Sequence, residues 1–121
     1  MVKTRGLTHI HLMVKDIQRS LNFYQSVFGL QELFRSGDDL IFLNTPGSND
    51  RIALHQATQD HSVGPGGGIL HFGFELESKG DLDKAIEQVI THGGALKEKG
   101  EFRPGLPFAY VSDPDGYEIE L

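Results

Sequence analysis

The chain carries Thr8-His9-Ile10-His11-Leu12-Met13-Val14, which leads into a helical pattern of apolar residues that ends at Gly29. The same order returns in Leu70-His71-Phe72-Gly73-Phe74-Glu75-Leu76, which leads into a second helical pattern that ends at Gly93. The two histidines that open these segments are 62 residues apart in a chain of 121. A repeat of this length indicates two copies of one supersecondary unit that together fill the chain.

The first copy is predicted to form a strand, a helix and three more strands. His9, His11 and Met13 alternate with apolar neighbours, which is the period-two pattern of a strand with two histidines on one face. Asp16 is placed to cap the helix, whose apolar stripe consists of Ile17, Leu21, Tyr24 and Phe28. Short apolar segments between turn-rich sequences predict the three later strands at 30–34, 40–44 and 51–56.

The second copy repeats this order. Asp81 is the predicted helix cap, and the helix presents an apolar stripe of Leu82, Ile86 and Val89. The predicted strands lie at 70–76, 95–97, 108–112 and 118–121, and Asp113-Pro114-Asp115-Gly116 supplies the last turn. We therefore predict an α+β fold, in which one domain of residues 1–121 consists of two βαβββ modules at about 6–60 and 68–121.

The composition excludes several classes of protein. The chain has no cysteine, so any metal site must use nitrogen and oxygen ligands. Its net charge is −6 and its Lys and Arg residues are scattered, which argues against a nucleic-acid partner. No apolar run approaches the roughly 20 residues that span a membrane, and the N-terminus has no apolar signal segment. These features predict a cytoplasmic protein with neither a nucleic-acid nor a membrane partner.

The last strands of the two copies also correspond, because Ile52-Ala53-Leu54 matches Ile119-Glu120-Leu121. His9, His71, Ala53 and Glu120 are thus four equivalent positions, and three of them carry groups that bind metal ions. A single histidine on a strand is more often a hydrogen-bonded core residue, but this combination favours a shared metal site. Two imidazoles and one carboxylate suit divalent Fe, Mn, Zn, Ni or Co and leave coordination positions open, as a catalytic site requires.

Two further histidines share the predicted faces of these strands. His11 lies one pleat from His9, too far to bind the same metal ion through the same rotamer, so we interpret it as a substrate-facing group or a general base. His55 follows Ala53 by two residues and could replace the missing ligand or act as an acid-base group. The alternatives are a strand-lining histidine with a backbone partner for His11 and a solvated strand end for His55.

The chain resembles the vicinal oxygen chelate superfamily over essentially its whole length. The resemblance rests on the segments Gly6 to Phe23-Tyr24, Phe28-Gly29-Leu30, Leu70 to Phe74, and Tyr110 to Leu121 with its Asp-Pro-Asp-Gly turn. It implies paired βαβββ modules that form a cup-shaped mixed sheet around a metal ion, with His9, His71 and Glu120 as ligands. In related proteins of this size the cup is often built between two subunits, so the resemblance also implies a homodimer.

Departures from the members of the superfamily narrow the expected chemistry. Glyoxalase I places a second glutamate where this chain has Ala53, which weakens that assignment. Extradiol dioxygenases combine two histidines and a glutamate with a nearby histidine and tyrosine, and Tyr110, ten residues before Glu120, has the offset of that tyrosine. Fosfomycin-resistance enzymes carry a polar potassium-binding loop where residues 102–108 are largely apolar here.

We therefore predict a metal-dependent enzyme, dioxygenase-like or lyase-like, that chelates a small oxygenated organic substrate on a divalent metal ion. His11, His55 and Tyr110 are its predicted catalytic groups. An alternative from another class is a metal-free binding protein of the bleomycin-resistance kind, which sequesters an aromatic ligand. A structural dimerisation module is the third possibility. The histidine and glutamate set favours the enzyme, because a sequestering cup does not need it.

Overall fold

The computed structural model describes residues 1–121 and confirms the predicted α+β fold. The chain divides into two compact units, Met1–Val63 and Gly64–Leu121. Each unit follows the order strand, helix and three strands, and each contains one four-stranded mixed sheet. Neither helix has the length and apolar character that crossing a lipid bilayer requires.

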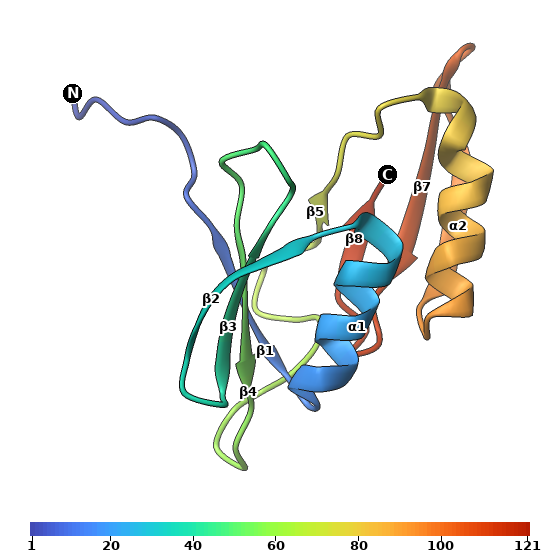
Figure 1. Cartoon of the computed structure of the whole chain (residues 1–121). Coiled ribbons are helices and arrows are strands. Elements are labelled where there is room, and N and C mark those ends of the chain that lie inside the picture. Colours follow the sequence, from blue (N-terminus) through green and yellow to red (C-terminus); the bar gives the residue numbers. More distant parts are fainter. The chain divides into compact units, whose positions relative to one another are not determined.

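The first unit (blue to green in Figure 1) arranges its sheet in the order β1-β4-β3-β2. Strands β1 and β4 run parallel, whereas β2 with β3 and β3 with β4 are antiparallel. The bounds of its elements are β1 Ile10–Val14, α1 Ile17–Phe28, β2 Gln31–Ser36, β3 Leu40–Asn44 and β4 Ile52–Gln56. The crossover through α1 leads from one edge strand, β1, to the other edge strand, β2, and the chain then returns through β3 to β4, which pairs with β1.

The ends of α1 follow the predicted signals. The Asp16 carboxylate accepts hydrogen bonds from the backbone N–H groups of Gln18 and Arg19, both at 3.1 Å, and so caps the helix. Gly29 ends the helix with a φ of 65°, a left-handed conformation that glycine adopts without strain. The Gln56 side chain on β4 accepts from the backbone N–H of Ile17 and fastens the start of the helix to the sheet.

One face of this sheet carries the core of the unit. The predicted stripe is confirmed at Leu21 and Tyr24, which are buried, but Ile17 and Phe28 are only half-buried. Ser20 and Phe23 are buried as well, so the helix packs through a wider face than the stripe predicted. The buried strand residues that belong to this core are Leu12, Val14, Ile41, Leu43, Ile52 and Leu54.

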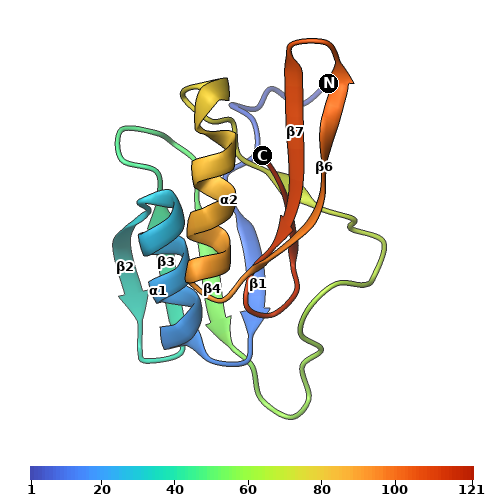
Figure 2. The same ribbon diagram turned by 90° about the vertical axis from the view of Figure 1, so that its right-hand side faces the viewer.

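The second unit has the sheet order β5-β8-β7-β6, in which β5 and β8 are the parallel pair. Figure 2 shows the long β6–β7 hairpin in orange and red. The bounds of the elements are β5 Phe72–Gly73, a 3-10 turn at Lys79–Asp81, α2 Leu82–Thr91, β6 Ala95–Arg103, β7 Leu106–Ser112 and β8 Glu118–Glu120. The predicted stripe of α2 is confirmed, because Leu82, Ile86 and Val89 are all buried.

Several local predictions for this unit need correction. The strand expected at 70–76 is reduced to the two residues of β5. Asp81 precedes α2 but makes no side-chain cap hydrogen bond, because Ser78 already caps the 3-10 turn by accepting from the backbone N–H of Gly80. Residues 102–108, expected as a loop, are the end of a hairpin, since β6 extends to Arg103 and β7 begins at Leu106.

Candidate functional site

The strand registers support the equivalence of the two modules. Ile10 pairs with Ile52 between β1 and β4, and Phe72 pairs with Ile119 between β5 and β8. One residue before the first member of each pair are His9 and His71. One residue after the second member are Ala53 and Glu120. The sequence match between the two copies is therefore also a match of structural positions.

His71 and Glu120 are brought together within the second unit. Nε2 of His71 lies 2.9 Å from Oε2 of Glu120, and the two side chains are 26% and 31% exposed. The two residues come from neighbouring parallel strands and meet diagonally, because the register partner of Glu120 is Gly73, which has no side chain to intervene. The nitrogen and the oxygen of the pair are both ligand types for a divalent metal ion.

Tyr110 completes a cluster with this pair. Its register partner between β7 and β8 is Glu120, and its ring centroid lies 5.1 Å from that of His71. Partial burial raises the pKa of the Tyr110 phenol, and the carboxylates of Glu120, Glu98 and Glu118 raise it further. The phenol is therefore held in its protonated form, in which it can donate a hydrogen bond.

Glu118 is a neighbour of His71 that the sequence analysis missed. Its Oε1 lies 3.9 Å from Nδ1 of His71, on the side of the ring opposite Glu120. The Nδ1 atom is buried and has no hydrogen-bond partner. The sequence did contain a signal, because Glu118 precedes Glu120 by two residues on one strand and so shares its face.

His11 and His55 form a pair on the first unit's sheet. Nε2 of His11 lies 3.0 Å from Nδ1 of His55, and the ring centroids are 5.1 Å apart. On the outer side of the pair, Oδ2 of Asp39 lies 4.0 Å from Nε2 of His55. Partial burial lowers the pKa of His11, and His55 and His9 lower it further, so the neutral imidazole is favoured.

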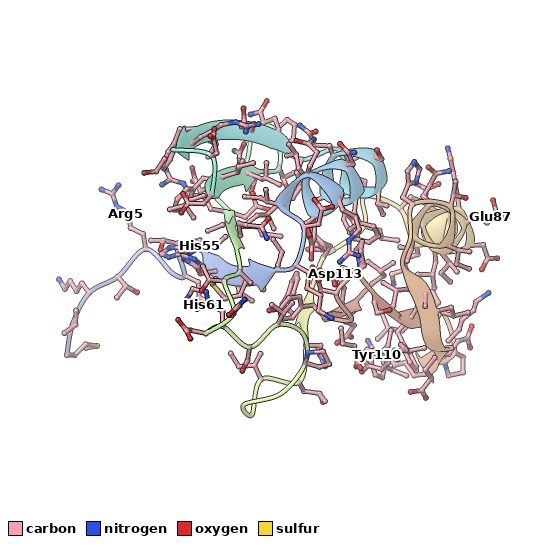
Figure 3. All side chains as sticks on the ribbon, turned by 90° about the horizontal axis from the view of Figure 1, so that it is seen from below. Arg5, His55, His61, Glu87, Tyr110 and Asp113 are labelled. Carbon is pink, nitrogen blue, oxygen red and sulfur yellow. The ribbon has the colours of Figure 1, made fainter.

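Two further histidines of the first unit, His9 and His61, are not part of the His11–His55 hydrogen bond. The His9 ring is exposed, and its Nδ1 lies 2.6 Å from the hydroxyl of Thr8. The sequence analysis left His61 outside the candidate site, yet its ring centroid lies 6.0 Å from that of His55, and Figure 3 shows the two side chains close together. A loop position with no strand periodicity had no signal that would place it there.

The His71–Glu120 pair has a geometry that suits two ligands of one divalent metal ion. The 2.9 Å between Nε2 of His71 and Oε2 of Glu120 is about the separation of two ligand atoms that share one ion at bonds of about 2.1 Å. Neither unit by itself brings three His, Asp or Glu side chains together as a metal-binding group. The predicted ligand set takes His9 from the first unit, so it stays a prediction.

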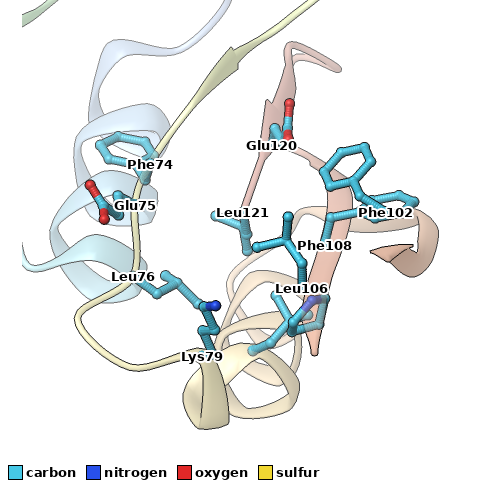
Figure 4. A pocket seen from close by; sticks show the side chains of 11 residues that line it. Phe74, Glu75, Leu76, Lys79, Phe102, Leu106, Phe108, Glu120 and Leu121 are labelled. Atoms are coloured by element: carbon cyan, nitrogen blue, oxygen red, sulfur yellow. The ribbon is translucent and has the colours of Figure 1, made fainter. Parts of the chain in front are cut away.

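A pocket of about 270 Å³ opens beside Glu120 in the second unit. In Figure 4, Glu120 lies at one end of the lining and Lys79 at the other, with Phe74 on the left and Phe102 and Phe108 on the right. The rest of the lining is largely apolar and consists of Glu75, Leu76, Leu82, Phe102, Leu106, Pro107 and Leu121. This surface can receive an apolar group next to a carboxylate and an ammonium group.

The chain is similar in sequence to one protein family and to several known enzymes. The model of the Glyoxalase/Bleomycin resistance protein/Dioxygenase superfamily matches residues 6–121. A lactoylglutathione lyase of Neisseria meningitidis is 32% identical, over 95% of this chain and 88% of that protein. A probable trivalent organoarsenical cleaving enzyme of Bacillus subtilis is 28% identical, over 93% of this chain and 76% of that protein.

Solved structures of several proteins are similar to this chain in fold. The fosfomycin resistance protein FosX of Listeria monocytogenes has a TM-score of 0.77 at 24% identity, over 98% of this chain and 93% of that chain. A glyoxalase-related enzyme of Fulvimarina pelagi has a TM-score of 0.77 at 23% identity, over 97% of this chain and 86% of that chain. These likenesses agree with the α+β fold.

Proposed function

We propose that this chain, which belongs to the glyoxalase/bleomycin resistance protein/dioxygenase superfamily, is a metal-dependent enzyme that acts on a small oxygenated organic molecule. The observation that carries the proposal is the contact of 2.9 Å between Nε2 of His71 and Oε2 of Glu120. The two side chains are partly exposed and so remain open to an ion and a substrate. Their positions recur in the first unit as His9 and Ala53, which supports His9 as the third ligand.

A divalent metal ion bound by His9, His71 and Glu120 would supply Lewis acidity and chelate neighbouring oxygen atoms of the substrate. We propose catalytic roles for three further side chains. The protonated Tyr110 phenol, beside His71, can donate a hydrogen bond to a substrate oxygen. His11 and His55 form a hydrogen-bonded pair in which a neutral imidazole nitrogen can accept a proton.

The pocket beside Glu120 supports a substrate with an apolar body. Aromatic and aliphatic side chains make up most of its lining, and Lys79 offers the one ammonium group among the lining residues. An aromatic or alkyl group of the substrate would bury apolar surface in this pocket, and the oxygen atoms of the substrate would then lie near Glu120. A negatively charged substituent would be attracted by Lys79.

The reaction type is proposed as lyase-like or dioxygenase-like. The lyase alternative is supported by relatives named as lactoylglutathione lyase and as organoarsenical cleaving enzyme. Ala53 argues against the lactoylglutathione lyase reaction itself, because glyoxalase I places a second glutamate at this position. The dioxygenase alternative is supported by the combination of Tyr110 with two histidines and one glutamate. We also propose a homodimer, as the resemblance to two-subunit members of the superfamily implies.

The test is a metal analysis of anaerobically purified protein and of the variants His71→Ala and Glu120→Ala. His92→Ala is the matched control, because His92 lies at the end of α2 and its Nδ1 contacts the Gln88 carbonyl oxygen at 2.9 Å. We expect near-stoichiometric metal in the wild type and in the control, and a loss of metal in both site variants. Bound Fe or Mn leads to oxygen-uptake assays with catechols, and bound Zn, Ni or Co leads to lyase assays.

A wild-type protein that takes up none of these metals after reconstitution would contradict the proposal. The alternative function, a metal-free protein that sequesters an aromatic ligand, then predicts a rise in melting temperature with aromatic ligands and no turnover. If His71→Ala binds as much metal as the wild type, His71 is not a ligand and the proposed metal site is wrong.

A further inference from the structure

The imidazole of His71 has two ring nitrogens in different situations. Nε2 faces Oε2 of Glu120 at 2.9 Å, whereas Nδ1 is buried without a hydrogen-bond partner. A buried polar atom that makes no hydrogen bond destabilises the folded state relative to one that does. Such atoms are rare in folded proteins and are often explained by a functional role of the residue.

The carboxylate of Glu118 lies beside this buried nitrogen. Its Oε1 lies 3.9 Å from Nδ1, which is too long for a hydrogen bond and within the range of an ion pair. His71 and Glu118 each lie one residue before the register pair Phe72 and Ile119 of β5 and β8, so they hold corresponding positions on the two strands. The Glu118 side chain is 28% exposed, and so a change of rotamer can shorten the distance.

We infer that Glu118 is a positioning residue, which accepts a hydrogen bond from Nδ1 of His71 and thereby directs Nε2 toward the metal ion. The inference rests on the proposed function. Ligating histidines generally donate their second ring N–H to a carboxylate or carbonyl oxygen, and that bond fixes both the tautomer and the ring orientation. With the proton held on Nδ1, the lone pair of Nε2 is free on the side of Glu120.

This assignment gives two glutamates of one strand different tasks. Glu120 contacts the nitrogen that would bind the ion, and Glu118 lies at the nitrogen that would carry the proton. The first unit has no counterpart of Glu118, since Arg51 holds the equivalent position, one residue before Ile52. The positioning contact is therefore a property of the second module alone.

The experiment measures Zn²⁺ binding by calorimetry for the wild type, Glu118→Ala and Glu118→Gln. Glu98→Ala is the control, because Glu98 is a carboxylate paired with Tyr110 in the register of β6 and β7 and has no contact with His71 in the described geometry. We expect Glu118→Ala to weaken Zn²⁺ binding about 10–100-fold at unchanged stoichiometry. Glu118→Gln keeps an oxygen acceptor and should recover most of the affinity, and Glu98→Ala should stay near the wild type.

A second readout is the ¹⁵N NMR spectrum of the His71 side chain in the Zn²⁺-loaded protein. The inference expects an Nδ1–H tautomer in the wild type and loss of protection of that proton in Glu118→Ala. If Glu118→Ala and Glu98→Ala weaken Zn²⁺ binding equally, Glu118 acts only through its charge and the inference is overturned. Wild-type affinity for Zn²⁺ in Glu118→Ala would overturn it as well. If the wild type itself binds none of Fe²⁺, Mn²⁺, Zn²⁺, Ni²⁺ and Co²⁺, the proposed function fails, and this outcome is distinct from the two outcomes above.

Discussion

Nε2 of His11 and Nδ1 of His55 lie 3.0 Å apart, so one of the two imidazoles donates a hydrogen bond and the other accepts it. The two residues come from the parallel strands β1 and β4 and meet diagonally, since Met13 is the register partner of His55. The accepting nitrogen must be unprotonated. When both imidazoles become cationic, the hydrogen bond is therefore lost and two positive charges lie side by side.

This pair predicts a pH dependence of stability in the metal-free protein. Burial, His55 and His9 lower the pKa of His11 below 6.5 in the folded state, so the unfolded chain binds a proton at a higher pH than the native chain does. Stability is therefore complete above the unfolded pKa and falls as the pH drops through the interval down to the folded pKa. The melting temperature of His11→Asn should fall less than that of the wild type between about pH 7.5 and 5.5. Equal falls would contradict this prediction.

The phenol of Tyr110 is predicted to ionise late. Its pKa is raised above 10.0 by burial and by the carboxylates of Glu120, Glu98 and Glu118. In an alkaline titration of tyrosinate absorbance, the component that is lost in Tyr110→Phe should lie above pH 10.0. Glu98→Gln removes one of the raising charges and should shift that component to lower pH. A component that titrates below its ordinary pKa would refute the prediction.

The cap of α1 predicts a difference between two aspartates. Asp16→Ala removes a carboxylate that accepts two backbone hydrogen bonds, so it should lower the free energy of unfolding by about 1 kcal/mol. Asp81→Ala is the matched control, because Asp81 precedes α2 without a side-chain cap bond, and it should cost less than about 0.5 kcal/mol. Urea denaturation measures both, and equal losses would show that the cap geometry is not the cause.

The core of the first unit predicts a large loss at Leu54. This residue is fully buried on β4, and Leu54→Ala should destabilise the protein by about 2–5 kcal/mol, because it leaves a cavity behind the lost methyl groups. Leu33→Ala on β2 changes the same atoms at a side chain that is 40% exposed and should stay within about 0.5 kcal/mol of the wild type. Denaturation midpoints of the two variants provide the comparison.

Much of the fold was predictable because local signals agreed with one another. Asp16 and Gly29 marked the ends of α1, and β3 was predicted with its observed bounds at Leu40–Asn44. The errors arose where tertiary context competes with local pattern. Ser78 takes the capping role expected of Asp81, because an extra 3-10 turn precedes α2. The hairpin partner β7 extends β6 to Arg103, although residues 98–103 lack a strand pattern of their own.

The sequence by itself determined the order of elements in each module and the equivalence of His9 with His71 and of Ala53 with Glu120. It could do so because side chains alternate along a strand and a repeat preserves that alternation. Only the tertiary structure decided which groups meet. His71 lies between Glu118 and Glu120, and His11 contacts His55, because the register of strands distant in sequence brings diagonal neighbours within reach. Period two assigns a face to each residue, but only the pairing of strands sets the distance between two side chains on that face.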